Sequence, residues 1–182
     1  DQDICIGASV QLTASGGLTY LWMPPTYLNN ANIPNPVSTP LFTTTYAVKV
    51  TAGSNCPPST DTVTVVVHPI PPVYAGMDTT IMAGTGVTLT ATGGGVIYQW
   101  SPYSTLSCSA CTTPYANPLQ TTTYIVITTD VFGCRNQDTV TVFVEDMLTL
   151  YVPNAFTPSN HDAYNGIFYA YGIGIYQFEF YI

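Results

Sequence analysis

The sequence predicts an all-β protein built from antiparallel β-sandwich units in tandem. Short stretches of β-branched and aromatic residues recur with glycine and proline turn signals between them, and no stretch shows helical periodicity. The same strand candidates also occur twice in the same order, which is typical of a duplicated unit. These observations together favour a row of small sandwiches.

The best-defined duplicated element is a triple threonine followed by tyrosine and alternating β-branched residues. It spans residues 43–50 in the first copy and residues 121–128 in the second. Tyr46, Val48 and Val50 fall on one face at a period of two, which predicts a strand. Equivalent positions in this element lie 78 residues apart, whereas those near the start of each copy lie 77 apart. The two copies therefore differ by one residue near the glycines of the first turn.

The first copy is expected to contain four core strands. They are predicted at residues 9–14, 18–23, 44–51 and 61–67. The connection between the second and third strands carries five prolines, which exclude a helix there. Trp22 is the natural residue to fill the core, and Tyr46 is similar to the corner tyrosine at the start of a late sandwich strand.

The repeat divides the chain into three parts. Residues 1–68 form the first predicted unit, residues 69–145 the second, and residues 146–182 an incomplete third. Prolines at 69–72 predict a stiff spacer at the start of the second unit, and the glycine run 93–95 predicts a hairpin turn there. Units of this size bury only about 60% of their unfolded surface, so cross-links would help them.

Composition restricts the partners. The 182 residues carry ten acidic and two basic side chains, a net charge of −8, which argues against nucleic acid and anionic membranes. Only 7% of residues are charged, so lysine is too scarce to protect strand edges, and lateral association with neighbouring copies is expected. No apolar run reaches the length of a membrane helix, and we expect the chain to be a segment of a longer, processed polypeptide.

The five cysteines favour an oxidising compartment. Cys5 precedes the first core strand and Cys56 precedes the last, so a bridge between them is predicted to close the first unit and contribute roughly 4 kcal/mol. In the second unit, Cys108 and Cys111 are expected to form a local bridge that leaves Cys134 free. The alternative is a bridge from Cys134 to one of that pair. A zinc or redox role for the C-x-x-C pair is disfavoured because it lacks a second ligand pair and a helix.

Several duplicated motifs resemble a known family. They are Ile4-Cys5-Ile6-Gly7, Leu12-Thr13-Ala14, Tyr20-x-Trp22-x-Pro24, Thr43-Thr44-Thr45-Tyr46 and Asp61-Thr62-Val63. The order of these motifs is similar to the PKD-like, immunoglobulin-like repeats of bacterial surface proteins, which are strung along adhesins and secreted enzymes. The resemblance implies tandem immunoglobulin-like sandwiches with a stalk or adhesive role.

The third part carries a more specific motif. It comprises Pro153, Asn154, Ala155, Phe156, Thr157 and Pro158. This motif resembles the start of the gliding-motility-associated C-terminal domain, the type B sorting signal of the type IX secretion system. The resemblance implies export to the surface of a Gram-negative bacterium and a partner of the PorP/SprF kind, an outer-membrane barrel of the secretion machinery. The sequence ends at Ile182, where the family's domain would continue into a further strand.

The loop after this motif departs from the family pattern. Ala163 and Gly166 stand where the family has glycine and aspartate, and the loop is one residue longer. Asp162 with Asn160 and Asn165 forms a weak calcium candidate, but a tight turn is favoured there. No other cofactor is expected.

Such bacteria also O-glycosylate Asp-Thr-aliphatic motifs. Thr62 and Thr139 lie in such motifs, and Thr79 fits more loosely. The alternative is that these threonines are ordinary strand residues. Sugars there would help so uncharged a surface to stay soluble.

An enzyme active site is not predicted. The two histidines, His68 and His161, lie in a spacer and in a loop, and no serine, histidine and aspartate combine into a catalytic pattern. The acids that could pair for glycoside hydrolysis are expected in solvated turns: Asp130, Asp138, Glu145 and Asp146.

Three functions remain. The first is a stalk or adhesin segment of a type IX-secreted surface protein. The second is a subunit of an extracellular filament or sheath that exchanges strands, suggested by the aromatic stretch 171–182. The third is the non-catalytic tail of a secreted hydrolase, binding sugar through Tyr27, Tyr103 or Tyr115.

Overall fold

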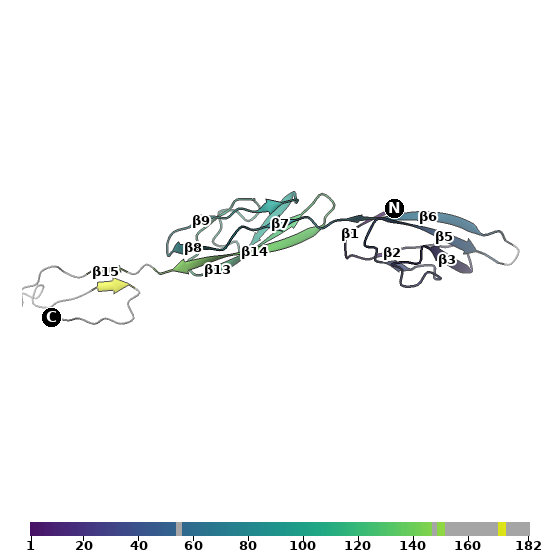
Figure 1. Ribbon diagram of the computed structural model, residues 1–182, viewed down its shortest axis with the longest axis horizontal. Coiled ribbons are helices and arrows are strands. Elements are labelled where there is room, and N and C mark those ends of the chain that lie inside the picture. The colour runs from purple at the N-terminus through teal and green to yellow at the C-terminus, as the bar shows by residue number, and fades with distance from the viewer. Residues whose placement is uncertain (54–55, 147–148, 152–170, 174–182) are drawn as a thin grey trace, which may run out of the picture.

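The computed structural model describes residues 1–53, 56–146, 149–151 and 171–173, and for the last two segments only the backbone. These residues form strands and no helix. Two β-sandwiches follow one another along the long axis of the molecule, as Figure 1 shows. The predicted all-β class is confirmed.

The first sandwich contains six strands. They are β1 (Gln2–Cys5), β2 (Val10–Gln11), β3 (Thr19–Met23), β4 (Val37–Ser38), β5 (Thr44–Thr51) and β6 (Ser59–His68). One sheet has the order β1-β6-β5-β3, and β2 pairs with β4 in the other. The pairs β3–β5 and β5–β6 are antiparallel, while β1 runs parallel to β6 at the edge.

The second sandwich repeats this plan and adds to it. Its strands are β7 (Val73–Tyr74), β8 (Thr79–Met82), β9 (Val87–Thr88), β10 (Thr92–Gly93), β11 (Ile97–Ser101), β12 (Tyr115–Ala116), β13 (Thr122–Thr129) and β14 (Arg135–Glu145). The main sheet has the order β11-β13-β14-β8, and β12 pairs with β9. The added element is β7, which pairs with β10. This repeated topology is immunoglobulin-like.

Each sandwich has its own hydrophobic core. The first core is formed by Leu12, Trp22, Tyr46, Val48 and Val65. The second is formed by the equivalent Leu89, Trp100, Tyr124, Val126 and Val142, together with Ala75, Ile81, Ala91, Ala116 and Val140. Both tryptophans and both tyrosines are at most 3% exposed, as expected from the sequence.

The buried aromatic side chains are tied to the connections that cross the core. The Trp22 indole donates to the Ile33 carbonyl over 3.0 Å, and Trp100 donates to Cys111 over 2.9 Å. The prolines keep these connections extended, so the carbonyl oxygens face the indoles instead of a helical partner. The polar atom of each buried ring is therefore satisfied.

The strand predictions hold best for the long hairpin of each unit. β5 covers the residues predicted for it, whereas the segment predicted at 9–14 shortens to β2. β1 and β4 were not predicted as strands. Beyond the second sandwich, β15 (Thr149–Tyr151) pairs antiparallel with β16 (Tyr171–Ile173).

Candidate functional site

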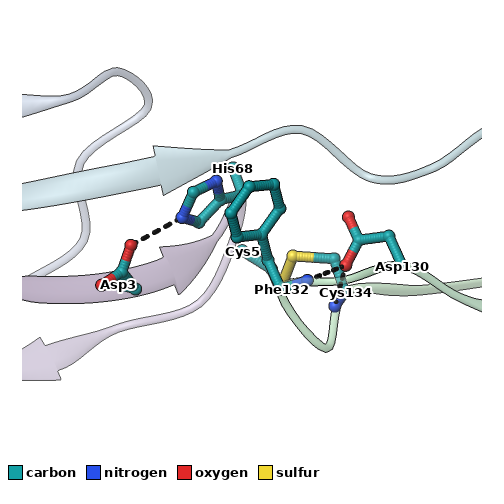
Figure 2. Close-up of a disulfide and its surroundings, with 6 residues drawn as sticks. All are labelled: Asp3, Cys5, His68, Asp130, Phe132 and Cys134. Carbon is teal, nitrogen blue, oxygen red and sulfur yellow. Dashed lines mark hydrogen bonds and ion pairs between the residues drawn. A yellow bond between two sulfur atoms is a disulfide. The ribbon is translucent and has the colours of Figure 1, made fainter.

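The candidate site is the junction between the two sandwiches. β1 and β6 run side by side to this end of the first sandwich, because Cys5 pairs with His68 in their parallel register. From the second sandwich, the turn between β13 and β14 reaches the same place, as Figure 2 shows. Two contacts join the elements there, a disulfide and a stacked pair of rings.

The first contact is covalent. A disulfide links Cys5 to Cys134 across 129 residues of sequence, with a Cα–Cα distance of 5.5 Å. Cys134 is fully buried. The bond therefore fixes the end of β1 in one sandwich to the β13–β14 turn of the other (Figure 2).

The predicted bridge between Cys5 and Cys56 is wrong, and strand direction explains why. Cys56 lies before the start of β6, whereas Cys5 lies beside the last residue of that strand. β6 is ten residues long, so roughly 30 Å separates its two ends at about 3.3 Å per residue. A disulfide needs Cα atoms within about 7 Å. Cys56 is free and exposed.

The turn that carries Cys134 is shaped by hydrogen bonds within it. The Asp130 carboxylate accepts the backbone N–H groups of Phe132 (2.9 Å) and Cys134 (2.8 Å). Gly133 has a φ of +83°, which favours glycine because it has no Cβ. Asp130 therefore shapes the turn that presents Phe132 and Cys134 to the first sandwich.

The second contact is a stacked pair of rings. The His68 imidazole lies against the Phe132 ring with centroids 3.7 Å apart and an interplanar angle of 13°. On its other side, His68 Nε2 is 2.7 Å from the Asp3 carboxylate oxygen. The His68 side chain is only 12% exposed. The junction thus combines a covalent bond and a stacked pair between the sandwiches, and the hydrogen bond to Asp3 holds His68 within the first sandwich (Figure 2).

Sequence reasoning missed the junction. Asp3 and Phe132 were not singled out, and Asp130 was considered only as a solvated turn acid. One signal was present: the Cys56 position keeps a cysteine in the second unit, at Cys134, while the Cys5 position does not, so a bridge within each unit was not repeated.

The other acids considered for catalysis do not meet at one site with Asp130. Asp138, the fourth residue of β14, accepts the Ala75 N–H over 2.8 Å. Glu145 ends β14 beside Met82, and the exposed Asp146 follows it. Asp130 and Asp138 hold a turn and a neighbouring segment in place through these hydrogen bonds.

The second disulfide lies within the second sandwich. It joins Cys108 to Cys111 in the long connection between β11 and β12. Because the Cys111 carbonyl accepts the Trp100 indole N–H, the bridge holds the segment that caps the core tryptophan. The predicted local bridge is therefore present, but both predicted states of Cys134 are wrong, because it pairs with Cys5.

The remaining predicted positions are scattered. Thr62 and Thr139 are exposed on β6 and β14, and Thr79 is half-buried on β8. Tyr27 lies in the first sandwich, whereas Tyr103 and Tyr115 lie in the second; their exposed fractions are 42%, 72% and 48%. The sorting motif at 153–158, the calcium candidates and His161 lie outside the described residues.

Within the part of the chain that the structure describes, no group of three or more histidine, cysteine or acidic side chains is placed to hold a metal ion. The same part contains no helix long and apolar enough to cross a membrane.

Comparison with known proteins reveals structural likeness only. No family model matches the chain, and no curated protein matches it. Among solved structures, the first two immunoglobulin domains of DIP-gamma are 13% identical with a TM-score of 0.40, covering 80% of this chain and 93% of that one. The eight N-terminal domains of Down Syndrome Cell Adhesion Molecule are 15% identical with a TM-score of 0.41, covering 86% and 28%.

A third likeness is to extracellular domains 3–5 of Drosophila OTK, at 12% identity and a TM-score of 0.35, covering 84% of this chain and 64% of that one. The immunoglobulin-like assignment of this chain stands on its own strand topology and on its buried tryptophans and tyrosines.

Proposed function

We propose that the chain is a non-enzymatic spacer segment of an extracellular surface protein, in which two immunoglobulin-like sandwiches are held in one fixed arrangement. The observation that carries this proposal is the disulfide from Cys5 to Cys134. A linker alone allows neighbouring domains to move relative to each other. A bridge between them, supported by the His68–Phe132 stack, restricts that motion.

The histidine and acidic side chains support the same proposal through the contacts that they make. His68 is stacked on Phe132 and hydrogen-bonded to Asp3. Asp130 is engaged with its own turn, and Asp138 holds β7. Side chains used in this way position strands and turns, and their polar atoms are not directed at a place where a substrate could bind. An oxidising, extracellular location fits the two disulfides.

Distance measurements between the sandwiches test the spacer. In a Cys56→Ser background, which removes the free thiol, one spin label at Leu18→Cys and another at Leu119→Cys report on the two sandwiches. Both sites are more than three-quarters exposed. We expect one narrow distance distribution for the intact protein and a broad one for Cys5→Ser with Cys134→Ser. Cys108→Ser with Cys111→Ser is the matched control, because it removes a bridge within one sandwich and should leave the distribution narrow.

Two results would contradict the spacer. A broad distribution in the oxidised, unmodified protein would mean that the junction does not fix the arrangement. A distribution that stays narrow without the Cys5–Cys134 bridge would mean that the bridge is not what fixes it.

We further propose that the part from residue 146 onward serves as a type IX export signal. The motif Pro153 to Pro158 carries this part of the proposal. Replacing Phe156 and Pro158 by alanine should abolish secretion of a fused reporter in a bacterium with that system, while Thr62→Ala should not. Unchanged secretion of the motif variant would refute the export role.

A further inference from the structure

The second sandwich has a pocket of about 280 Å³ beside β11, the edge strand of its main sheet. Part of its lining comes from β11 and β13, and the rest comes from the connection that follows β11. None of the described residues that line the pocket is charged. The pocket therefore suits a neutral ligand.

The floor of the pocket lies on the outer face of the sheet. Gln99 and Ser101 are exposed on either side of Trp100, which is 3% exposed and belongs to the core. Because side chains alternate along a strand, Gln99 and Ser101 point away from the core. Gln99 is paired with Ile127 of β13, which also lines the pocket. The floor therefore combines hydrogen-bonding groups with an aliphatic side chain.

The wall of the pocket is a segment that is held against β11. The Trp100 N–H donates to the Ser109 carbonyl over 2.8 Å. The disulfide from Cys108 to Cys111 encloses Ser109 and Ala110, both of which line the pocket. The exposed Ser109 is therefore held beside the edge strand at two places.

Tyr103 adds an aromatic ring to the lining. This residue is 72% exposed although it belongs to the pocket. Its carbonyl accepts the Leu106 N–H over 3.1 Å, in a turn that fixes the backbone there. A tyrosine ring offers a flat apolar face together with a hydroxyl group. Tyr103 therefore gives a ligand a surface on which C–H groups can stack.

The first sandwich carries different residues at the equivalent positions. The two units align at an offset of 78 here, because Trp22 donates its N–H to Ala31 as Trp100 does to Ser109. The counterparts of the pocket residues are mostly apolar: Leu21 for Gln99, Met23 for Ser101, Pro25 for Tyr103, Ala31 for Ser109 and Lys49 for Ile127. The polar and aromatic groups of the pocket are therefore not required by the fold that the two units share.

We propose that this pocket binds one ring of a neutral saccharide. The C–H face of the sugar stacks on Tyr103, and its hydroxyls bond to the Gln99 amide and to the hydroxyls of Ser101 and Ser109. Amide and hydroxyl groups both donate and accept hydrogen bonds, as sugar hydroxyls do. The volume lies just below the roughly 300–1,000 Å³ of pockets for drug-sized ligands, which suits a single ring.

Charge restricts the ligand further. The lining supplies no cation to pair with an anionic sugar, and the whole chain has a net charge of −8. Repulsion by that net charge disfavours acidic saccharides. This inference gives the second sandwich a binding role and goes beyond the spacer role of the two sandwiches together.

A titration of the intact chain with methyl β-D-glucopyranoside, followed in ¹H–¹⁵N NMR spectra, tests the proposal. All ring substituents of this probe are equatorial, so both of its faces present C–H groups. We expect saturable shifts of the Gln99 side-chain amide and the Ser109 backbone signal, with a dissociation constant in the millimolar range expected for so small a ligand. Sorbitol has similar hydroxyls but no ring face, and it should produce no such shifts.

Three substitutions assign the binding to the pocket. Tyr103→Ala should weaken it at least about tenfold, whereas Tyr103→Phe keeps the ring and should stay within about threefold. Gln99→Leu introduces the residue of the first sandwich and should weaken binding about tenfold, because sugar hydroxyls would lose their partner. Each site is exposed, so the spectra of the free variants should keep the dispersion of the folded protein.

Tyr27→Ala is the matched control for the loss of an exposed tyrosine. Tyr27 is 42% exposed and lies in the first sandwich, so its removal should leave the binding unchanged. The double variant Cys5→Ser with Cys134→Ser should also bind normally, because all lining residues belong to the second sandwich. A failure of the spacer role is thereby distinguished from a failure of this proposal.

Three results would overturn the proposal. Absence of saturable shifts at Gln99 and Ser109, at probe concentrations well above the millimolar range, would show that the pocket takes no sugar ring. Undiminished binding by Tyr103→Ala would show that the ring does not stack there. Equal binding of sorbitol would show that the site does not recognise a sugar ring.

Discussion

The two sandwiches share a frame and differ in what surrounds it. Trp22 and Tyr46 occupy the same places as Trp100 and Tyr124, in sheets of the same order. In the second sandwich β7 pairs with β10, and each sandwich contributes different residues to the junction. The duplicated residues thus specify the fold, while residues that are not duplicated join the two units.

The largest expected effect comes from removing the core tryptophans. Trp22→Ala and Trp100→Ala should each destabilise their own sandwich by about 3–5 kcal/mol, because each leaves a cavity and an unpaired carbonyl. Differential scanning calorimetry of both variants measures this. Since the cores are separate, each variant should shift a different transition. A single transition shifted equally by both would mean that the sandwiches unfold as one.

Substitutions at two equivalent glycines test the close packing of β7 against β10. Gly93 has a φ of +147°, and a Cβ there would collide with the Pro72 carbonyl oxygen. Its counterpart Gly16 has a φ of +94° with no atom within 4 Å of such a Cβ. Gly93→Ala should cost about 2–4 kcal/mol because it adds a collision to the backbone strain, and Gly16→Ala about 1–2 kcal/mol from strain alone.

Urea unfolding of the two glycine variants gives the comparison directly. Equal costs would contradict the close approach of β7 to β10. Hydrogen exchange at Ala75 adds a local reading, since its N–H should lose protection only in the Gly93→Ala variant.

The smallest difference is expected at the two core tyrosines. The Tyr46 hydroxyl accepts a hydrogen bond from the fully buried Ser38 and donates to the Thr26 carbonyl. The Tyr124 hydroxyl pairs with Thr105, which is only half-buried. Tyr46→Phe should therefore cost about 1–3 kcal/mol, and Tyr124→Phe nearer 1 kcal/mol, because Thr105 can turn to water.

Chemical denaturation of the two Phe variants measures this difference, and the ring volume is unchanged in both. A larger cost for Tyr124→Phe would show that burial of the partner does not set the penalty.

The fold was predictable where a residue acts within its own unit. Periodic strands, core tryptophans and proline-rich connections all have local causes, so the repeat revealed them. The junction was not predictable in this way, because Cys5 meets Cys134 only after the parallel course of β1 along β6 is known. The cover provided by β7 was missed for a similar reason, since residues 69–72 were interpreted as a spacer and nothing local marks a two-residue strand.

Peptide mapping of the unreduced protein tests the account most directly. Digestion with pepsin at acidic pH, which suppresses disulfide exchange, should yield a cross-linked fragment that contains Cys5 and Cys134, with Cys56 recovered as a free, alkylatable thiol. A fragment that joins Cys5 to Cys56, with Cys134 alkylated instead, would contradict the fixed junction and the spacer role inferred from it.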